Sequence, residues 1–175
     1  MKTNVATLLL SFFLSTFVNA QNKNKTWVIR ANVGASLSIS NVSLEKAFAK
    51  RHSLSIIPAY GFLRSEKATY KAYGIGLDYK YYLSSQSFAP QGFYALTGGS
   101  MAQGRANIET TGKTADIKGY TLHAEGGKQW IFKKGFTIDA HLGLQYINLN
   151  GKSDGYDFPF AGWLPAFGAG IGYAF

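Results

Sequence analysis

The strongest constraint in this sequence is the strict two-residue alternation of its last nine residues. The odd positions are apolar or aromatic, and every position between them is glycine or alanine: Phe167, Ala169, Ile171, Tyr173 and Phe175 alternate with Gly168, Gly170, Gly172 and Ala174. Because successive side chains of a β-strand point to opposite faces, this segment predicts a strand with one apolar face and one face of small residues. A strand buried in a sandwich seldom ends on its last apolar residue, so a conventional soluble core is disfavoured.

The same alternation recurs along the chain and predicts an all-β fold. Segments of roughly ten residues match the ~9–11 residues that a tilted strand needs to cross a bilayer. The stretch 27–46 is long enough for two short strands, broken near Gly34 to Ser36 or at the phase slip near Asn41. Segments 54–63 and 93–103 carry apolar residues on both faces, which leaves their register open. The other strands are expected near 52–63, 70–83, 92–104, 118–132, 136–149 and 161–175.

A tight hairpin is predicted at 133–135. A three-residue loop keeps Phe132 and Phe136 on the same face, and Gly135 stands where such a loop needs a left-handed residue. This hairpin would pair Gln129 with Asp139, Gly127 with His141, and Glu125 with Gly143. Long polar connections are expected near 64–69, 105–117 and 150–159, at the opposite end of the strands.

The N-terminus has the features of a secretory signal peptide. Lys2 precedes an apolar stretch from Val5 to Val18, and Val18 and Ala20 are small residues at the positions that a signal peptidase recognises. The predicted signal peptide is 1–20, and the predicted mature chain, 21–175, forms a single domain beginning at Gln21. No other segment approaches the ~20 apolar residues of a membrane helix, so membrane residence would depend on strands.

The amino-acid composition and net charge restrict the kinds of scaffold and binding partner that this protein can have. The chain has no cysteine, which excludes a disulfide scaffold in this exported protein. Without Lys2, 17 Lys and Arg stand against 9 Asp and Glu, a net charge of +8. Export argues against nucleic acid as the partner of this charge. Anionic lipid headgroups or the phosphates of lipopolysaccharide are the expected partners.

Several motifs carry a resemblance to a known class. They are Tyr81-Tyr82-Leu83 before a short turn, Gly92-Phe93-Tyr94 after it, the segment 129–136, and the final Gly-Tyr-Ala-Phe. With these motifs the mature chain resembles small bacterial outer-membrane β-barrels of the size of OmpX and the OmpA membrane domain, in particular an uncharacterised barrel family. The resemblance implies a single antiparallel up-and-down transmembrane β-barrel, with eight strands as the economical even number. It also implies an outer-membrane location, assisted by the insertion machinery, and a monomer.

Two groups of residues follow from this architecture. The apolar face of the last strand is the expected insertion signal: Phe167, Ile171, Tyr173 and Phe175. The opposite faces of the strands carry a set of charged and imidazole side chains that would point into a narrow barrel: Arg30, Asp78, Lys80, His123, Glu125, Asp139 and His141. These residues could form a proton or ion path. The favoured interpretation is a filled interior in which opposite charges satisfy one another.

Aromatic residues near strand ends suit girdles at the two membrane interfaces. The residues assigned to them are Trp27, Tyr70, Tyr81, Tyr82, Tyr94, Trp130, Tyr146 and Trp163. Lys128 interrupts the apolar face near a strand end, where its long side chain could reach the interface.

An enzyme of this architecture would modify lipid A, with a histidine and a serine two positions apart on one strand face. None of the three histidines fits, because His52, His123 and His141 are followed two positions later by Leu54, Glu125 and Gly143. We therefore expect no catalytic residues, no cofactor and no metal. The leading hypothesis is an outer-membrane barrel with a structural or surface-interaction role. The alternative is a soluble periplasmic or secreted β-barrel that binds a small apolar ligand.

Overall fold

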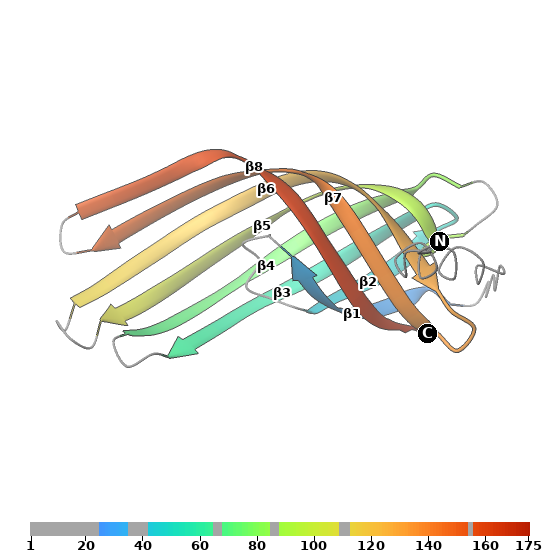
Figure 1. The fold of residues 1–175 in the computed structure, drawn as a ribbon, viewed down its shortest axis with the longest axis horizontal. Coiled ribbons are helices and arrows are strands. Elements are labelled where there is room, and N and C mark those ends of the chain that lie inside the picture. The colour runs from blue at the N-terminus through green and yellow to red at the C-terminus, as the bar shows by residue number, and fades with distance from the viewer. Residues whose placement is uncertain (1–24, 35–41, 65–67, 85–87, 109–112, 154–155) are drawn as a thin grey trace, which may run out of the picture.

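The chain folds into a closed barrel of eight antiparallel strands, each hydrogen-bonded to its neighbour in sequence (Figure 1). The computed structural model describes residues 25–34, 42–64, 68–84, 88–108, 113–153 and 156–175. The strands are β1 (Trp27–Gly34), β2 (Val42–Ala49), β3 (His52–Arg64), β4 (Ala68–Tyr82), β5 (Gly92–Ile108), β6 (Lys113–Ile131), β7 (Phe136–Ser153) and β8 (Tyr156–Ala174). The predicted eight-stranded up-and-down barrel is confirmed, while the predicted signal peptide lies outside the described residues.

Pairing between the first and last strands closes the barrel. The antiparallel register runs from Val28 opposite Ala174 to Gly34 opposite Gly168. Beyond it, the Trp27 amide donates to the Phe175 carbonyl at 3.0 Å, and the Phe175 amide donates to the Trp27 carbonyl at 2.9 Å. The stretch 27–46 therefore supplies two strands, as predicted, and its break falls within 35–41, outside the described residues.

The strands differ greatly in length. β1 and β2 have 8 residues each, whereas β5 to β8 have 17 to 19. Figure 1 shows β3 to β8 continuing well past the end of β1, away from the C-terminus. The two ends of the barrel are called here the turn end, which carries the 133–135 hairpin and the C-terminus, and the far end, which carries the extended hairpins.

The expected long connections at 105–117 and 150–159 are wrong. β5 runs to Ile108 and β6 begins at Lys113, while β7 runs to Ser153 and β8 begins at Tyr156. Polar residues in these segments pair across the strands, as when Arg105 Nε contacts Asp116 Oδ1 at 2.6 Å. At this end the polarity of the two faces is reversed, because the outward Arg105 and Asp116 are polar whereas the inward Ala106, Ala115 and Ile117 are apolar. No helix in the described part of the chain is long and apolar enough to cross a membrane.

The two faces of the wall have opposite chemistry. Outward side chains form an apolar surface that includes Ile29, Leu44, Ile56, Leu77, Met101, Leu122, Leu142, Leu144 and Ile171, all exposed. The register that the sequence left open is now clear, because Ile56 and Phe93 are exposed outside while Tyr94 is buried inside. Charged side chains fill much of the inward face in the turn-end half, so this part of the barrel is apolar outside and polar within.

The predicted hairpin and its register are confirmed. Gly135 has a φ of 98°, and its amide donates to the Phe132 carbonyl at 2.8 Å. In the ladder that follows, Gln129 pairs with Asp139, Gly127 with His141, and Glu125 with Gly143. A left-handed glycine at this turn thus sets which residues face the lumen along both β6 and β7.

The inward glycines of β8 make room for long side chains from its neighbours. A Cβ atom at Gly172 would lie 2.8 Å from Arg30 Cγ, and one at Gly168 would lie 2.7 Å from His141 Cε1. Both distances are shorter than carbon atoms tolerate. This glycine track explains the small-residue face of the last strand, because the aliphatic stem of Arg30 and the His141 imidazole occupy the space that larger β8 side chains would fill.

Gly143 and Gly126 offer a matched pair for testing how tightly the wall is packed. At Gly143 a Cβ would clash with the Ala124 carbonyl and lie 2.6 Å from Glu125 Cα, whereas at Gly126 the nearest atom is 4.0 Å away. We expect Gly143→Ala to lower the free energy of unfolding by about 1–3 kcal/mol, and Gly126→Ala to change it by less than about 0.5 kcal/mol. Urea unfolding in detergent micelles, followed by tryptophan fluorescence, measures both. Equal midpoints would contradict the close contact at Gly143.

Candidate functional site

Four charged side chains from four strands meet inside the barrel. Arg30 from β1 and Lys80 from β4 each contact both Glu45 from β2 and Asp139 from β7. Arg30 Nη1 lies 2.8 Å from Glu45 Oε2 and 3.3 Å from Asp139 Oδ2. Lys80 Nζ lies 3.4 Å and 3.2 Å from the same two oxygens. These four residues are called here the charge cluster.

The charge cluster is sealed from solvent and balanced in sign. The relative exposure of its members is 4% or less, and two positive charges face two negative ones. Removing a charge from water costs several kcal/mol unless partners surround it, so each ion depends on the two ions of opposite sign. The strand register places Arg30 in the charge cluster, because Arg30 pairs with Ser43 of β2 on one side and with Gly172 of β8 on the other.

Neutral polar groups complete the coordination of both carboxylates. Tyr82 and Ser53 donate their hydroxyl protons to Glu45 Oε1 at 2.7 and 2.6 Å. The Tyr94 hydroxyl donates to Asp139 at 2.9 Å, and Lys80 Nζ stands 4.0 Å from the centre of the Tyr94 ring. Gln129 Oε1 accepts from both cations of the cluster. With these bonds the buried oxygens gain neutral donors as well as cations.

Two histidine–carboxylate pairs lie beside the charge cluster. His123 Nε2 is 3.0 Å from Asp78 Oδ1, and His141 Nδ1 is in hydrogen-bond contact with Glu125 Oε2. All four side chains line a cavity of about 90 Å³, together with Arg30, Lys80 and Asp139 of the cluster. Such a volume holds a few water molecules and is far below the ~300–1,000 Å³ of ordinary ligand pockets.

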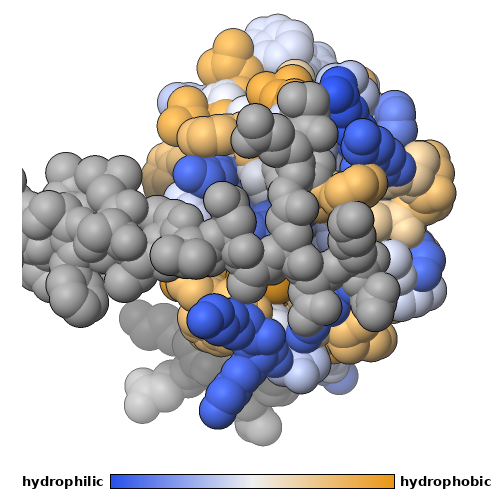
Figure 2. Space-filling model, turned by 90° about the vertical axis from the view of Figure 1, so that its right-hand side faces the viewer, coloured by the Kyte–Doolittle hydropathy of each residue, from blue (hydrophilic) through white to orange (hydrophobic). Residues whose placement is uncertain are grey.

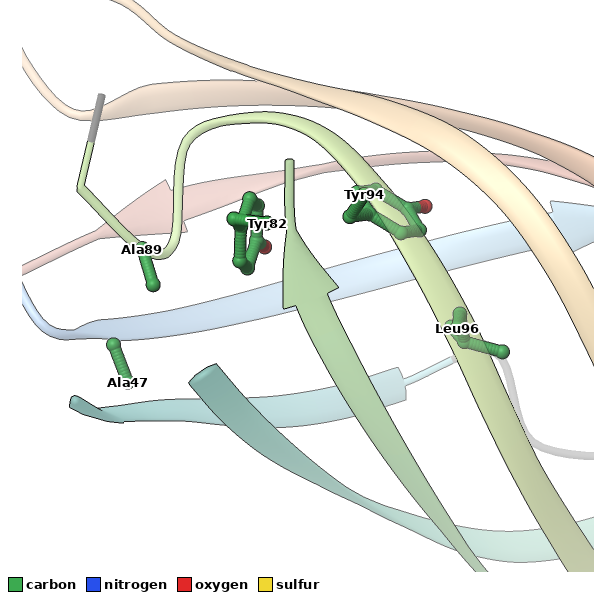
Figure 3. Close-up of a cluster of buried hydrophobic side chains, with 5 residues drawn as sticks. All are labelled: Ala47, Tyr82, Ala89, Tyr94 and Leu96. Atoms are coloured by element: carbon green, nitrogen blue, oxygen red, sulfur yellow. The ribbon is translucent and has the colours of Figure 1, made fainter. Parts of the chain in front are cut away.

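The turn end of the lumen is closed by packed side chains. Figure 3 shows Tyr82 and Tyr94 within the barrel, in a buried cluster with Ala47, Ala89 and Leu96. The segment before β5 folds across this end, because the Ala89 amide donates to the Lys50 carbonyl at 2.9 Å. Gln129 Nε2 donates to the Pro90 carbonyl at 2.5 Å and ties the same segment to the charge cluster.

The seven residues predicted to face the lumen all do so, and they form three groups. Arg30, Lys80 and Asp139 belong to the charge cluster, whereas Asp78 pairs with His123 and Glu125 with His141. Sequence reasoning missed Glu45, the fourth member of the charge cluster. The sequence feature that could have identified Glu45 is its position in the two-residue alternation. It lies on the face of β2 that also presents Ser43 and Ala47 to the interior.

Three residues assigned to the aromatic girdles are in fact interior. Tyr70 shares the inward face of β4 with Ala72 and lines an interior cavity together with Ala102 and Ile117. Tyr82 and Tyr94 are fully buried, with centroids 5.6 Å apart and their hydroxyls on the charge cluster. A tyrosine suits either position, since its ring is apolar and its hydroxyl needs a partner, and only the strand phase distinguishes them.

The proposed insertion-signal residues share the outer face of β8. Phe167, Ile171, Tyr173 and Phe175 are all more than half exposed there. Their role in insertion stays a prediction. Among the described residues, no group of three or more His, Asp or Glu side chains is arranged to hold a metal ion.

Breaking the charge balance should destabilise the barrel far more than breaking a surface pair. Glu45→Gln leaves Arg30 and Lys80 with one carboxylate between them, and we expect a loss of about 3–5 kcal/mol of unfolding free energy. The matched control is Asp116→Asn, which removes a charge from the exposed pair with Arg105 and should leave the unfolding midpoint nearly unchanged. Urea titration of both variants tests this, and a small effect at Glu45 would show that the cluster contributes little.

Three solved structures resemble this fold at low sequence identity. Acinetobacter baumannii CarO2 aligns with a TM-score of 0.50 and 14% identity, covering 87% of this chain and 100% of that one. Acinetobacter baumannii CarO gives a TM-score of 0.47 at 11% identity, over 86% and 97% of the two chains. The NMR structure of Escherichia coli outer membrane protein W gives 0.46 at 12%, over 86% and 98%.

These likenesses concern the fold. A search of curated proteins found no significant match. A family model does match, over residues 6–159, which is most of the sequence. The chain therefore belongs to the family described as protein of unknown function (DUF3575).

Proposed function

We propose that this protein is an integral outer-membrane β-barrel with a structural or surface-interaction role, without catalysis or cofactor. The observation that carries the proposal is the reversal of polarity across the wall. Apolar side chains such as Leu77, Leu122 and Leu142 are more than half exposed outside, while charged side chains are buried inside. Exposed apolar surface on this scale is unfavourable in water and favourable against lipid.

The different structures of the two ends of the barrel support one orientation in the membrane. The turn end carries the tight 133–135 hairpin and the C-terminus, which suits the periplasmic side of an outer-membrane barrel. The far end carries the extended hairpins, with exposed ion pairs between Arg105 and Asp116 and between Lys152 and Asp157. We place these hairpins outside the cell, where their polar surface is available for contact with other molecules or surfaces.

The alternative, a soluble barrel that binds an apolar ligand, requires the opposite arrangement. Its exterior would be polar and its lumen lined by apolar side chains. Here the turn-end half of the lumen holds the charge cluster and two histidine–carboxylate pairs around a cavity of about 90 Å³. A second cavity nearer the far end, lined in part by Ile117 and Leu149, has a volume of about 200 Å³, which is still below the ~300–1,000 Å³ of ordinary ligand pockets. These observations favour the membrane barrel.

A lipid-modifying enzyme is also disfavoured by the surroundings of the three histidines. His123 and His141 contact carboxylates inside the barrel, away from lipid. His52 lies near the turn end, where its Nδ1 contacts the Tyr79 hydroxyl at 2.5 Å and its ring packs near Tyr81. Ser53 donates to Glu45, so its hydroxyl is engaged in the charge cluster rather than with an imidazole.

Extraction from isolated outer membranes tests the proposed location. Because the apolar face would contact lipid all round the barrel, we expect the protein to stay in the pellet in alkaline carbonate and high salt and to be released by detergent. A soluble periplasmic protein carried through the same steps is the control. Release of this protein by carbonate alone would contradict the membrane proposal.

Planar-bilayer recording tests the closed lumen. The charge cluster, Tyr82, Tyr94 and the segment at Ala89 and Pro90 obstruct the turn end. We therefore expect the purified protein to show no steady ion conductance after insertion. A large and stable open state would mean that the interior is not packed as described.

A further inference from the structure

The turn-end half of the lumen carries more acids than permanent cations. Among the described residues its inward carboxylates are Glu45, Asp78, Glu125 and Asp139, and its inward permanent cations are Arg30 and Lys80. Other described cations at this end, such as Lys46 and Lys128, lie over outward aromatic rings, and Figure 2 shows hydrophilic side chains around this rim. With neutral histidines, this half of the lumen therefore has a net charge of −2.

Two histidines supply the missing positive charge when they are protonated. His123 Nε2 lies 3.0 Å from Asp78 Oδ1, and His141 Nδ1 contacts Glu125 Oε2. Each carboxylate outside the charge cluster thus has one imidazole beside it. One proton on each imidazole brings the net charge of this half of the lumen to zero. A buried carboxylate without its counter-charge is strongly unfavourable, so the charge balance depends on these two protons.

Glycines on neighbouring strands leave the space that the two pairs occupy. Gly98 of β5 pairs with Asp78 on one side and with His123 on the other. A Cβ atom at Gly98 would lie 2.7 Å from His123 Nε2 and would clash with Asp78 Oδ1. Gly143 and Gly168 leave similar space beside the second pair. Both pairs are therefore accommodated by the packing of the wall.

The two pairs are more accessible than the charge cluster. The side chains of His123 and His141 are 13% and 22% exposed, whereas the members of the charge cluster are at 4% or less. Thr121 lines both the cavity of about 90 Å³ that contains the pairs and the cavity of about 200 Å³ nearer the far end. Packed side chains close the turn end. Protons therefore reach the imidazoles through the far-end half of the lumen.

Side chains from six strands determine the electrostatic surroundings of the two imidazoles. The charged and titratable groups facing them are Arg30 of β1, Glu45 of β2, Asp78, Lys80 and Tyr82 of β4, Tyr94 of β5, Glu125 of β6 and Asp139 of β7. In the described residues, β3 and β8 present no charged side chain to this half of the lumen. Histidine is the residue type here that ordinarily changes charge between about pH 5 and 8.

We infer that the two histidine–carboxylate pairs form a proton-dependent switch that sets the charge balance of the barrel interior. With both imidazoles protonated, the lumen is neutral and the wall packs closely around it. Loss of both protons leaves Asp78 and Glu125 without counter-charge, and their repulsion and hydration destabilise the closed barrel. The inference that the protons come from outside the cell rests on the proposed function, whereas the charge balance requires only the closed barrel.

The pH dependence of urea unfolding in detergent micelles tests the switch. The folded barrel should keep protons that the unfolded chain releases above ~pH 6.5, the ordinary range of histidine. Stability should therefore fall as pH rises, because the folded state binds more protons than the unfolded state. We expect the unfolding equilibrium constant to rise about tenfold per pH unit for each such proton.

Variants that remove the surplus carboxylates should remove this dependence. Asp78→Asn/Glu125→Gln keeps the side-chain shapes and leaves a balanced lumen with neutral histidines, so we expect most of the pH dependence to be lost. The matched control is Asp116→Asn/Asp157→Asn, which makes the same change in net charge at the exposed far end and should keep it. His123→Gln alone should raise the unfolding constant about tenfold or more. Adding Asp78→Asn should restore it, a rescue that a purely steric role would not give.

Nuclear magnetic resonance of the ¹⁵N-labelled imidazoles reads the protonation states in the unsubstituted protein. Charged rings at His123 and His141, under conditions in which the unfolded chain has neutral ones, would support the inference. Neutral rings in both pairs would overturn it. A pH dependence that persists in Asp78→Asn/Glu125→Gln would also overturn it, because the protons would then bind elsewhere. These measurements are made in micelles, so release of the protein from membranes by carbonate would overturn the proposed function and leave them unaffected.

Discussion

The hydrogen-bond ladder between β1 and β8 is the contact on which the rest of the structure depends. It joins segments about 140 residues apart in sequence, from Val28 opposite Ala174 to Gly34 opposite Gly168. Closure removes the free edges that a sheet would otherwise expose over this stretch, which matters most where no water is present to satisfy backbone groups. It also brings Arg30 to the same interior as Asp139. An open sheet with the same strands would separate Arg30 from Asp139 and leave Arg30 with Glu45 of the adjacent strand as its carboxylate partner.

Closure then creates an electrostatic problem that the interior side chains solve. A barrel of eight strands is too narrow for bulk water, so charges that point inward must compensate one another. The charge cluster does so with two cations and two carboxylates, supported by Tyr82, Tyr94 and Gln129. The same packing obstructs the lumen, so stability and closure to ions have one structural origin.

The sequence was most informative where alternation was strong. The period of two predicted the strands, and Gly135 set the register that turns Glu125 and Asp139 inward. Glu45 was missed because the phase slips between β1 and β2, and strand phase cannot be carried across such a break. Tyr82 and Tyr94 were misplaced because an aromatic ring satisfies either face. The far-end strands were taken for loops because their outward residues, such as Arg105 and Asp116, are polar and only small or isolated apolar residues, such as Ala115 and Ile117, alternate with them.

The glycine track of β8 has a consequence for how this family can vary. Gly168 and Gly172 leave the volume that the His141 and Arg30 side chains occupy. The sizes of the side chains on facing strands are therefore sterically complementary. A larger residue on β8 is compatible only with a shorter one on β1 or β7, and losing Arg30 would in turn unbalance the charge cluster. These positions should therefore covary among homologous barrels, with glycine on one strand accompanying a long cation on its neighbour. The small residues on the inward face of β8 would then indicate that long charged or imidazole side chains stand opposite them on β1 and β7.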